Sequence, residues 1–193
     1  MSTQTVAVRT LDGVEFPVAG AYTLDASHTH AGFVVRHMKV AKVRGGFAGL
    51  TGSAVVAEDP LASSVEVSID TASIATRDEQ RDGHLRSPDF LDVDRHPTMQ
   101  FRSNGLTATG AGRFEIAGEL TIRGITREVV LDTTFEGALI DPWGNQRFGV
   151  TATTEINRED FGLTWNQALE AGGVLVGKKV RIEIEAELVR SQG

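Results

Sequence analysis

The C-terminal part of the chain alternates apolar and polar residues at every second position. Residues 180–188 carry an apolar set and a polar set in turn: Val180, Ile182, Ile184, Ala186 and Leu188 against Arg181, Glu183, Glu185 and Glu187. A period of two is typical of a β-strand with one buried and one solvated face. Eight or more such runs follow one another along the sequence. We therefore expect an all-β protein whose strands curl around a shared apolar interior.

The residues on the inward side of these runs predict what the interior contains. Phe33 and Val35 alternate with Arg36 and should point inward. Further inward positions hold rings at Phe101, Phe114, Phe135 and Phe148, and small residues at Ala31, Gly137, Ala152 and Ala186. A closed barrel of about eight strands can be filled by side chains or hold one apolar ligand. Small residues between the rings favour a slender channel, although a barrel plugged by its own rings is the alternative.

Three segments break the alternation. Residues 76–86 are polar and helix-tolerant, with Thr76 and Glu79 spaced as a capping box. Residues 87–92 predict a second short helix that has Ser87 as its N-cap. Residues 158–166 predict a short helix and loop near one end of the barrel. We expect the first two segments to form a flap together.

The chain is predicted to form one main domain. Its 193 residues suit a single β-barrel. Residues 1–19 read as an N-terminal extension or hairpin, with strands at 5–10 and 14–18 around a tight turn at 12–13. Residues 20–190 form the barrel domain.

Charge and composition narrow the possible partners. The chain has 19 Lys and Arg against 26 Asp and Glu, a net charge of −7, which argues against tight binding to nucleic acid or to an anionic membrane surface. A local basic mouth is still compatible with these totals. The absence of cysteine excludes disulfides, cysteine-ligated zinc and thiol catalysis.

The first 20 residues lack the pattern of a secretory signal, and no apolar run approaches the ~20 residues of a membrane helix. We expect a cytoplasmic protein with no integral membrane segment.

Histidine clusters offer the sequence's candidate chemistry. His28 and His30 are two residues apart and could share one face of a strand, but two ligands do not make a zinc site. His84 follows Arg81 and Asp82, a grouping that suits acid-base catalysis or a structural ion pair at a helix end. Nucleophile-elbow, Walker and dinucleotide motifs are absent from the sequence. We therefore expect a binding protein without catalytic residues, metal or cofactor.

Several motifs together resemble the YceI family of lipocalin-like polyisoprenoid-binding proteins. The opening motif of that family is matched by Tyr22, Asp25, His28 and Phe33, followed by His37. Its central motif is matched by Arg81, Asp82, His84, Leu85, Ser87, Asp89, Phe90 and Asp92, followed by His96, Pro97 and Phe101. Two later motifs are matched by residues 118–124 and 158–162. The resemblance covers residues 20–190, and Thr29 departs from the serine that the family often has there.

The resemblance implies an extended eight-stranded antiparallel lipocalin-like barrel with small helices over one end. Its long apolar pore would hold a polyisoprenoid or an isoprenoid quinone tail, for carriage, storage or sequestration. Relatives often pair, so a homodimer is a further expectation. The expected pore lining is Phe33, Val35, Phe101, Phe135, Phe148 and Ala152. The expected mouth residues are His37, Trp143 and Trp165, and the expected head-group donors are Arg158 or Lys178.

Two other functions are compatible with the same sequence. One is an enzyme or stress-linked binder of another amphiphile, such as a fatty acid or amide, acting through His37 or the His84 cluster. The other is a plugged barrel that serves as an interaction module. The chain length and head group of any lipid are left open.

Overall fold

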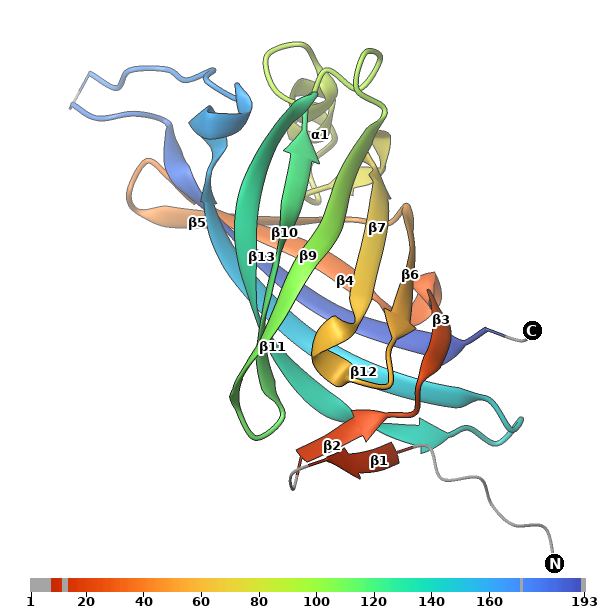
Figure 1. The fold of residues 1–193 in the computed structure, drawn as a ribbon. Helices are drawn as coiled ribbons and strands as arrows, with labels where there is room; N and C mark the ends of the chain where they lie inside the picture. Colours follow the sequence, from red (N-terminus) through yellow and green to blue (C-terminus); the bar gives the residue numbers. More distant parts are fainter. Residues whose placement is uncertain (1–7, 12–13, 171, 192–193) are drawn as a thin grey trace, which may run out of the picture.

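The chain folds into a closed antiparallel barrel, which the computed structural model describes over residues 8–11, 14–170 and 172–191 (Figure 1). Eight strands close it, each hydrogen-bonded to the next and the last to the first: β3 (Gly20–Leu24), β6 (Leu50–Val56), β7 (Ser64–Asp70), β9 (Thr98–Gly110), β10 (Arg113–Ile122), β11 (Ile125–Ile140), β12 (Gln146–Asn157) and β13 (Val176–Arg190). The period-two alternation along these strands explains the fold, because every strand buries one face. The predicted eight-stranded barrel is confirmed.

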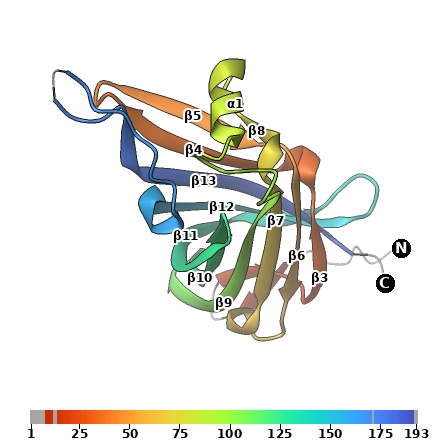
Figure 2. The ribbon, with the colours of Figure 1, turned by 90° about the horizontal axis from the view of Figure 1, so that it is seen from above.

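Three more strands extend the sheet outside the ring. The long strand β13 pairs with β3 near its end and with β4 (His30–His37) along its earlier part, so β3 and β4 follow one path broken by the 3₁₀ turn η1 (Ala26–His28). Next to β4 lies β5 (Ala41–Phe47), which meets β8 (Ile74–Ala75) through only two residue pairs. Figure 2 shows β4 and β5 projecting sideways from the barrel, beside the start of β13. We call residues 34–44 the β4–β5 arm.

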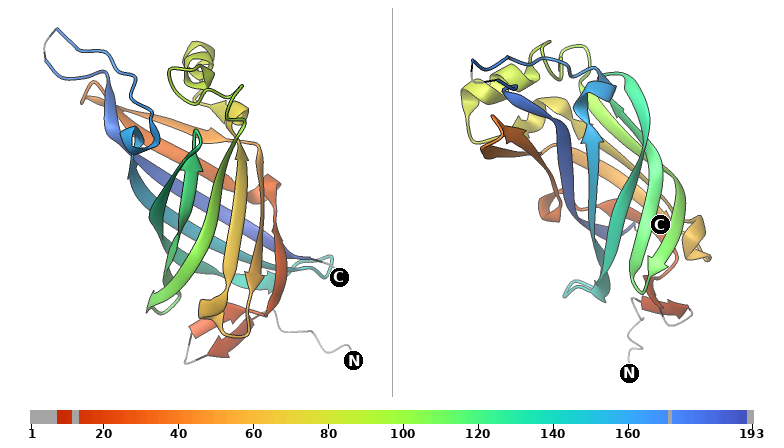
Figure 3. Two further views of the ribbon diagram at one scale, coloured as in Figure 1. Left: turned by 45° about the horizontal axis from the view of Figure 1, so that its top comes forward. Right: turned by 90° about the vertical axis from the view of Figure 1, so that its left-hand side faces the viewer.

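One end of the barrel is covered by α1 (Glu79–Arg86) and the turns after it (Figure 3). The capping box predicted for Thr76 is wrong, because Asp78 is the N-cap and accepts a hydrogen bond from the Arg81 N–H. Residues 87–92 form hydrogen-bonded turns, not the predicted second helix, with Ser87 O accepting from two later N–H groups. The 3₁₀ helix η4 (Arg158–Phe161) lies at the same end. Short helices therefore cap one end, as predicted.

No helix among the described residues combines the length and the apolar character that crossing a bilayer requires. Short 3₁₀ turns, η2 (Pro60–Ala62) and η3 (Thr71–Ser73), complete the connections between strands.

A small hairpin lies at the end of the barrel opposite α1. It consists of β1 (Val8–Leu11) and β2 (Val14–Pro17), which pair only with each other (Figure 1). The turn predicted at residues 12–13 and the strand start predicted at residues 5–7 lie outside the described residues. Phe16 of β2 packs on Phe114 of the barrel, with ring centroids 5.5 Å apart. The hairpin thus covers the second end without adding a strand to the ring.

We expect a chain that begins at residue 20 to keep the barrel. Since β1 and β2 add no strand to the ring, removing residues 1–19 should leave it closed. The removal costs the apolar contact of Phe16, the bonds that Arg9 donates to Ala57 O and to Glu58, and the Val18 carbonyl that accepts from the buried Tyr22 hydroxyl. We expect a loss of about 4 kcal/mol, or a fall in Tm of about 8–16 °C. Far-UV circular dichroism should be retained and the thermal transition should stay cooperative. A non-cooperative transition would show that the hairpin is part of the folding unit.

Candidate ligand-binding cavity

The barrel encloses a cavity of about 370 Å³. This volume lies within the range of about 300–1,000 Å³ found for small-molecule sites. The cavity is lined by inward side chains from strands all around the ring and by residues from the two covered ends. The barrel is therefore hollow, which excludes an interior filled from end to end by its own side chains.

The cavity wall is almost entirely aliphatic and aromatic. The polar exceptions are Thr29, Ser53, Ser63, Ser64, Thr133, Thr154 and Arg158. Among the described residues that line it, only Arg158 is ionisable. An apolar cavity of this kind stays dry and accepts apolar ligands. The wall offers burial to a hydrocarbon chain and no acid-base pair for catalysis.

Seven of the eleven residues singled out from the sequence line this cavity. They are Phe33 and Val35 on β4, Phe101 on β9, Phe135 on β11, Phe148 and Ala152 on β12, and Arg158 on η4. Period-two alternation placed the strand residues correctly on the inner face. Phe33 packs closely over Gly45, its cross-strand partner. A Cβ atom at position 45 would overlap the ring, so this contact requires glycine.

The three residues expected at the mouth do not line the cavity. His37 is the last residue of β4 and pairs with Ala41 and Val176 on the arm. Trp143 is 81% exposed in the turn between β11 and β12, at the end of the barrel away from α1. Trp165 packs against α1, with its ring centroid 4.6 Å from that of His84. The two tryptophans thus lie at opposite ends of the barrel and cannot share one mouth. The sequence could not predict their positions, because loop residues carry no periodicity that would place them.

Residues at both covered ends complete the lining and were missed from the sequence. Phe16 and Pro17 contribute at the β1–β2 end, and Leu85, Phe90 and Leu91 at the α1 end. Phe90 and Leu91 form an apolar pair within a polar segment. This pair is visible in the sequence and could have predicted a contact with the cavity, but we assigned it only to the flap. The hairpin residues carried no such signal.

Arg158 is the charged group in the cavity wall. It is only 3% exposed, and its guanidinium donates to three backbone carbonyls: Nε to Gly177 O at 2.9 Å, Nη2 to Val176 O at 3.5 Å, and Nη1 to Leu163 O. Burial lowers its pKa, against the opposing effect of the Glu159 charge. A guanidinium has five N–H groups, so two are left for a ligand. Arg158 can therefore hold a polar or anionic head group at the α1 end.

Lys178 was the alternative donor for a head group. Its side chain is 62% exposed and forms an ion pair of 2.8 Å with Glu159, and it does not line the cavity. Lys178 lies within the irregular stretch between Val176 and Val180, where the pairing of β13 with β4 is interrupted. Of the two predicted donors, only Arg158 reaches the interior.

The His84 cluster divides into two separate contacts. Asp82 accepts hydrogen bonds from the N–H and the hydroxyl of Thr76, at 2.8 and 2.5 Å, and Arg81 Nη2 donates to Thr76 O at 2.8 Å. These bonds pin α1 to the end of β8, in agreement with the structural interpretation of the pair. His84 instead pairs with Asp89, with Nε2 and Oδ2 2.9 Å apart. Asp82 is therefore committed to holding the flap.

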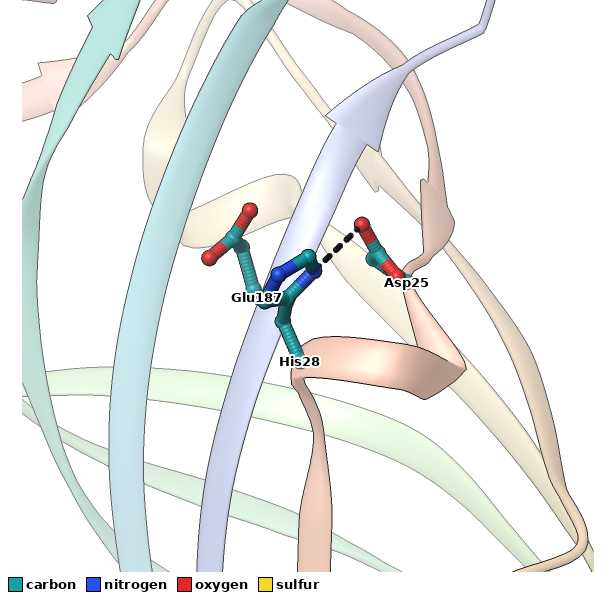
Figure 4. A group of neighbouring side chains, drawn as sticks. All are labelled: Asp25, His28 and Glu187. Atoms are coloured by element: carbon teal, nitrogen blue, oxygen red, sulfur yellow. Dashed lines mark hydrogen bonds and ion pairs between the residues drawn. The ribbon is translucent and has the colours of Figure 1, made fainter. Parts of the chain in front are cut away.

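A second charged cluster lies on the outer wall, where η1 meets β13 (Figure 4). Ligand atoms of Asp25, His28 and Glu187 lie within 4.8 Å of one another. Arg147 occupies the centre of the cluster: Nη1 is 2.8 Å from Asp25 and 2.6 Å from Glu187, and Nε is 2.7 Å from Asp141. Any cation would have to compete with this guanidinium for two of the three residues, so we assign the cluster as an ion-pair network. His30, expected beside His28, packs instead over Gly32 and Gly46.

Hydrogen bonds in this network depress the pKa values of two carboxyls. Bonds from Ser27, Arg147 and His28 hold the pKa of Asp25 well below its usual range, against a smaller desolvation effect. For Asp141, desolvation raises the pKa, but bonds from Asn145 and Arg147 and two backbone N–H groups outweigh it and hold the pKa well below its usual range. Both groups are therefore charged at neutral pH, and the network ties η1 to β12, β13 and the β11–β12 turn.

Comparison with known protein families identifies the family of this chain. The model of the YceI-like domain matches residues 22–188, nearly the whole barrel. The chain belongs to the YceI family. A UPF0312 protein of Staphylococcus aureus strain N315 is 37% identical over 176 residues, covering 89% of this chain and 98% of that relative. A UPF0312 protein of Azotobacter vinelandii is 38% identical over 149 residues, covering 76% of this chain and 78% of its own length.

Several solved structures share this barrel fold. A Campylobacter jejuni YceI protein is 28% identical with a TM-score of 0.68, covering 89% of this chain and 98% of its own. Burkholderia cenocepacia BcnA has a TM-score of 0.74 at 19% identity, covering 85% and 98% of the two chains. A polyisoprenoid binding domain from Saccharophagus degradans has a TM-score of 0.69 at 15% identity, covering 88% and 98%. The last two likenesses concern the fold alone.

Proposed function

We propose that the chain binds the tail of a polyisoprenoid or isoprenoid quinone inside the barrel and carries, stores or sequesters it. The observation that supports this most directly is the cavity of about 370 Å³ with an almost wholly apolar wall. The structural neighbour described as a polyisoprenoid binding domain points to the same ligand class.

The energetics of an apolar cavity suit such a ligand. Burying about 300 Å² of hydrocarbon surface is worth about 7 kcal/mol before the cost of immobilising the ligand. A prenyl tail is a long, narrow chain whose only branches are methyl groups, so it can follow a slender interior past the rings of Phe33, Phe101 and Phe148. Because Arg158 is the only ionisable described residue in the wall, the cavity favours binding over acid-base chemistry.

The decisive experiment is extraction of the purified protein with organic solvent, followed by mass spectrometry of the extract. We expect a prenyl lipid in stoichiometric amount, or, for protein stripped of ligand, uptake of geraniol, farnesol and geranylgeraniol with affinity rising with chain length. Fatty acids and fatty amides offered in parallel test the alternative amphiphiles. An empty extract together with no uptake of any prenyl alcohol contradicts the proposal.

The position of Arg158 predicts how the head group is recognised. We expect Arg158→Gln to weaken binding of farnesyl diphosphate about 10- to 100-fold, the value of one charge-assisted hydrogen bond. Binding of farnesol should change about two-fold or less, which separates head-group recognition from general loss of structure. Lys178→Gln, outside the cavity, should leave both affinities unchanged; calorimetric titration measures all of them. Equal weakening of both ligands would argue that Arg158 only supports the fold.

Transport, the cytoplasmic location and the homodimer stay predictions. Transfer of a bound prenyl lipid between two vesicle populations tests transport, cell fractionation tests location, and sedimentation velocity tests pairing.

A further inference from the structure

The charge of the chain is distributed unevenly, and the β4–β5 arm is its basic part. Four of the 19 Lys and Arg residues fall within residues 36–44, and none of the 26 Asp and Glu residues does. These four are Arg36, Lys39, Lys42 and Arg44, all exposed. None forms an ion pair with a residue that the structure describes, whereas Lys178, Lys179 and Arg181 on nearby β13 each pair with a glutamate.

The arm presents three of its four cations on one face, and the fourth, Lys39, lies in the turn at its tip. Phe33 and Val35 line the cavity, so the alternating residues Val34 and Arg36 point to the outer face of β4. Across the strand pair, Arg36 faces Lys42 and Val34 faces Arg44. Two like charges directly opposite each other destabilise a strand pair. An anionic partner would relieve this repulsion.

The tip of the arm is apolar and exposed. Val40 is 83% exposed and Met38 is 40% exposed. The Met38 N–H donates to Leu175 O at 2.9 Å, which brings Val174, 39% exposed, beside the tip. Figures 1 and 2 show this hairpin and the loop before β13 standing side by side, away from the barrel. Apolar residues flanked by cations are the pattern that inserts into a bilayer interface.

We propose that the β4–β5 arm docks on an anionic phospholipid bilayer, with Met38 and Val40 in the interface and the four cations against lipid phosphates. The inner face of the arm then connects the membrane to the cavity, because Val35 and its neighbour Val180 on β13 belong to the cavity wall. Passage of lipid along this face rests on the proposed function, but docking does not.

Two observations favour docking of the arm on a membrane. The exposed apolar patch, two residues of the hairpin tip and Val174 of the adjacent loop, is far smaller than the ~800 Å² per partner of a stable protein interface. The exposed ring of Trp143 lies at the opposite end of the barrel, beside an ion-pair network in which three carboxylates outnumber the single guanidinium of Arg147, so the arm suits an anionic surface better than that end does. Since charges act over about 10 Å at 0.1 M salt, the arm is attracted despite the net charge of −7.

Co-sedimentation with vesicles tests the docking. The full chain should bind vesicles of equal parts phosphatidylcholine and phosphatidylglycerol at about 0.1 M salt, bind weakly to phosphatidylcholine alone, and dissociate at about 0.5 M salt. Each basic residue at an anionic surface raises partitioning about five-fold, so the triple variant Lys39→Gln, Lys42→Gln, Arg44→Gln should bind about 100-fold more weakly.

A matched triple variant controls for total charge. Arg102→Gln, Arg113→Gln and Arg127→Gln remove the same three charges from exposed positions on β9, β10 and β11. This variant should bind anionic vesicles as the unaltered chain does. Val40→Asp should also abolish binding, since it places a carboxylate at the tip.

Farnesol uptake from ethanol, without vesicles, separates this proposal from the proposed function. An empty extract and no uptake of any prenyl alcohol, together with arm-dependent vesicle binding, would overturn the proposed function and leave docking supported. The docking proposal is overturned if the unaltered chain ignores anionic vesicles, or if the arm and control variants bind equally. It is also overturned if the arm variant only converts dimer to monomer in sedimentation velocity, which would assign the arm to a second copy.

Discussion

Ala152→Phe should nearly abolish uptake of prenyl alcohols while the barrel stays folded. Ala152 is 4% exposed, lies on β12 and faces the cavity, so a phenyl ring there occupies space that the ligand needs. Losing about 100 Å² of ligand burial removes about 2.5 kcal/mol, or roughly a 70-fold loss of affinity. Because the new ring enters an existing void, the usual overpacking cost of about 1–3 kcal/mol should be small.

The neighbouring position supplies a matched control. Thr153, next on the same strand, faces outward, since Ala152 faces the cavity. Thr153→Phe adds a ring to the same strand without entering the cavity, and titration should give unaltered affinity. Thermal melts report folding of both variants. If Ala152→Phe binds farnesol and geranylgeraniol with unchanged affinity, the ligand does not use the barrel interior.

Replacing Arg147 by Met should lower the stability of the fold, and the size of this loss should depend on pH. The substitution leaves Asp25, Asp141 and Glu187 facing one another without their shared cation. Removing one partner of a partly buried charge network is strongly destabilising, and we expect Tm at pH 7 to fall by about 5–10 °C. Differential scanning calorimetry measures the change.

The sign of the pH dependence follows from the depressed pKa values of Asp25 and Asp141. A carboxyl with a lower pKa in the folded state stabilises the fold above its unfolded pKa of about 3.9, and this contribution is lost as the pH falls through the folded pKa. Without Arg147 the contribution is already smaller at neutral pH. The gap in Tm between the two proteins should therefore narrow steadily from pH 5 to pH 2.5.

Arg190 offers a comparison at the same end of β13. Its Nη1 donates to the neutral amide of Gln146 at 2.6 Å and its Nη2 to Ala19 O at 3.1 Å, and no carboxyl of the residues that the structure describes forms an ion pair with it. Arg190→Met should lower Tm by an amount that does not change between pH 5 and pH 2.5. A gap for Arg147→Met that stays constant over this range would show that the network does not couple protonation to stability.

The hydrophobic pattern by itself determined the fold class and the wall of the cavity. Strand alternation has a fixed period, so the inward positions of Phe33, Phe101 and Ala152 follow from parity alone. The small residues among them indicated that room remains inside. The motifs around His84 indicated the family, because such motifs are local in sequence and need no tertiary information.

Only the tertiary structure decided which segments meet across the barrel. Arg147 binds Asp25 across a separation of 122 residues, and no local pattern encodes that contact. The same holds for Phe16 closing one end, for the two tryptophans at opposite ends, and for the β4–β5 arm standing clear of the ring. Parity fixes which face a strand residue takes, whereas the register between distant strands and the path of each loop fix its neighbours. Those depend on packing summed over the whole chain.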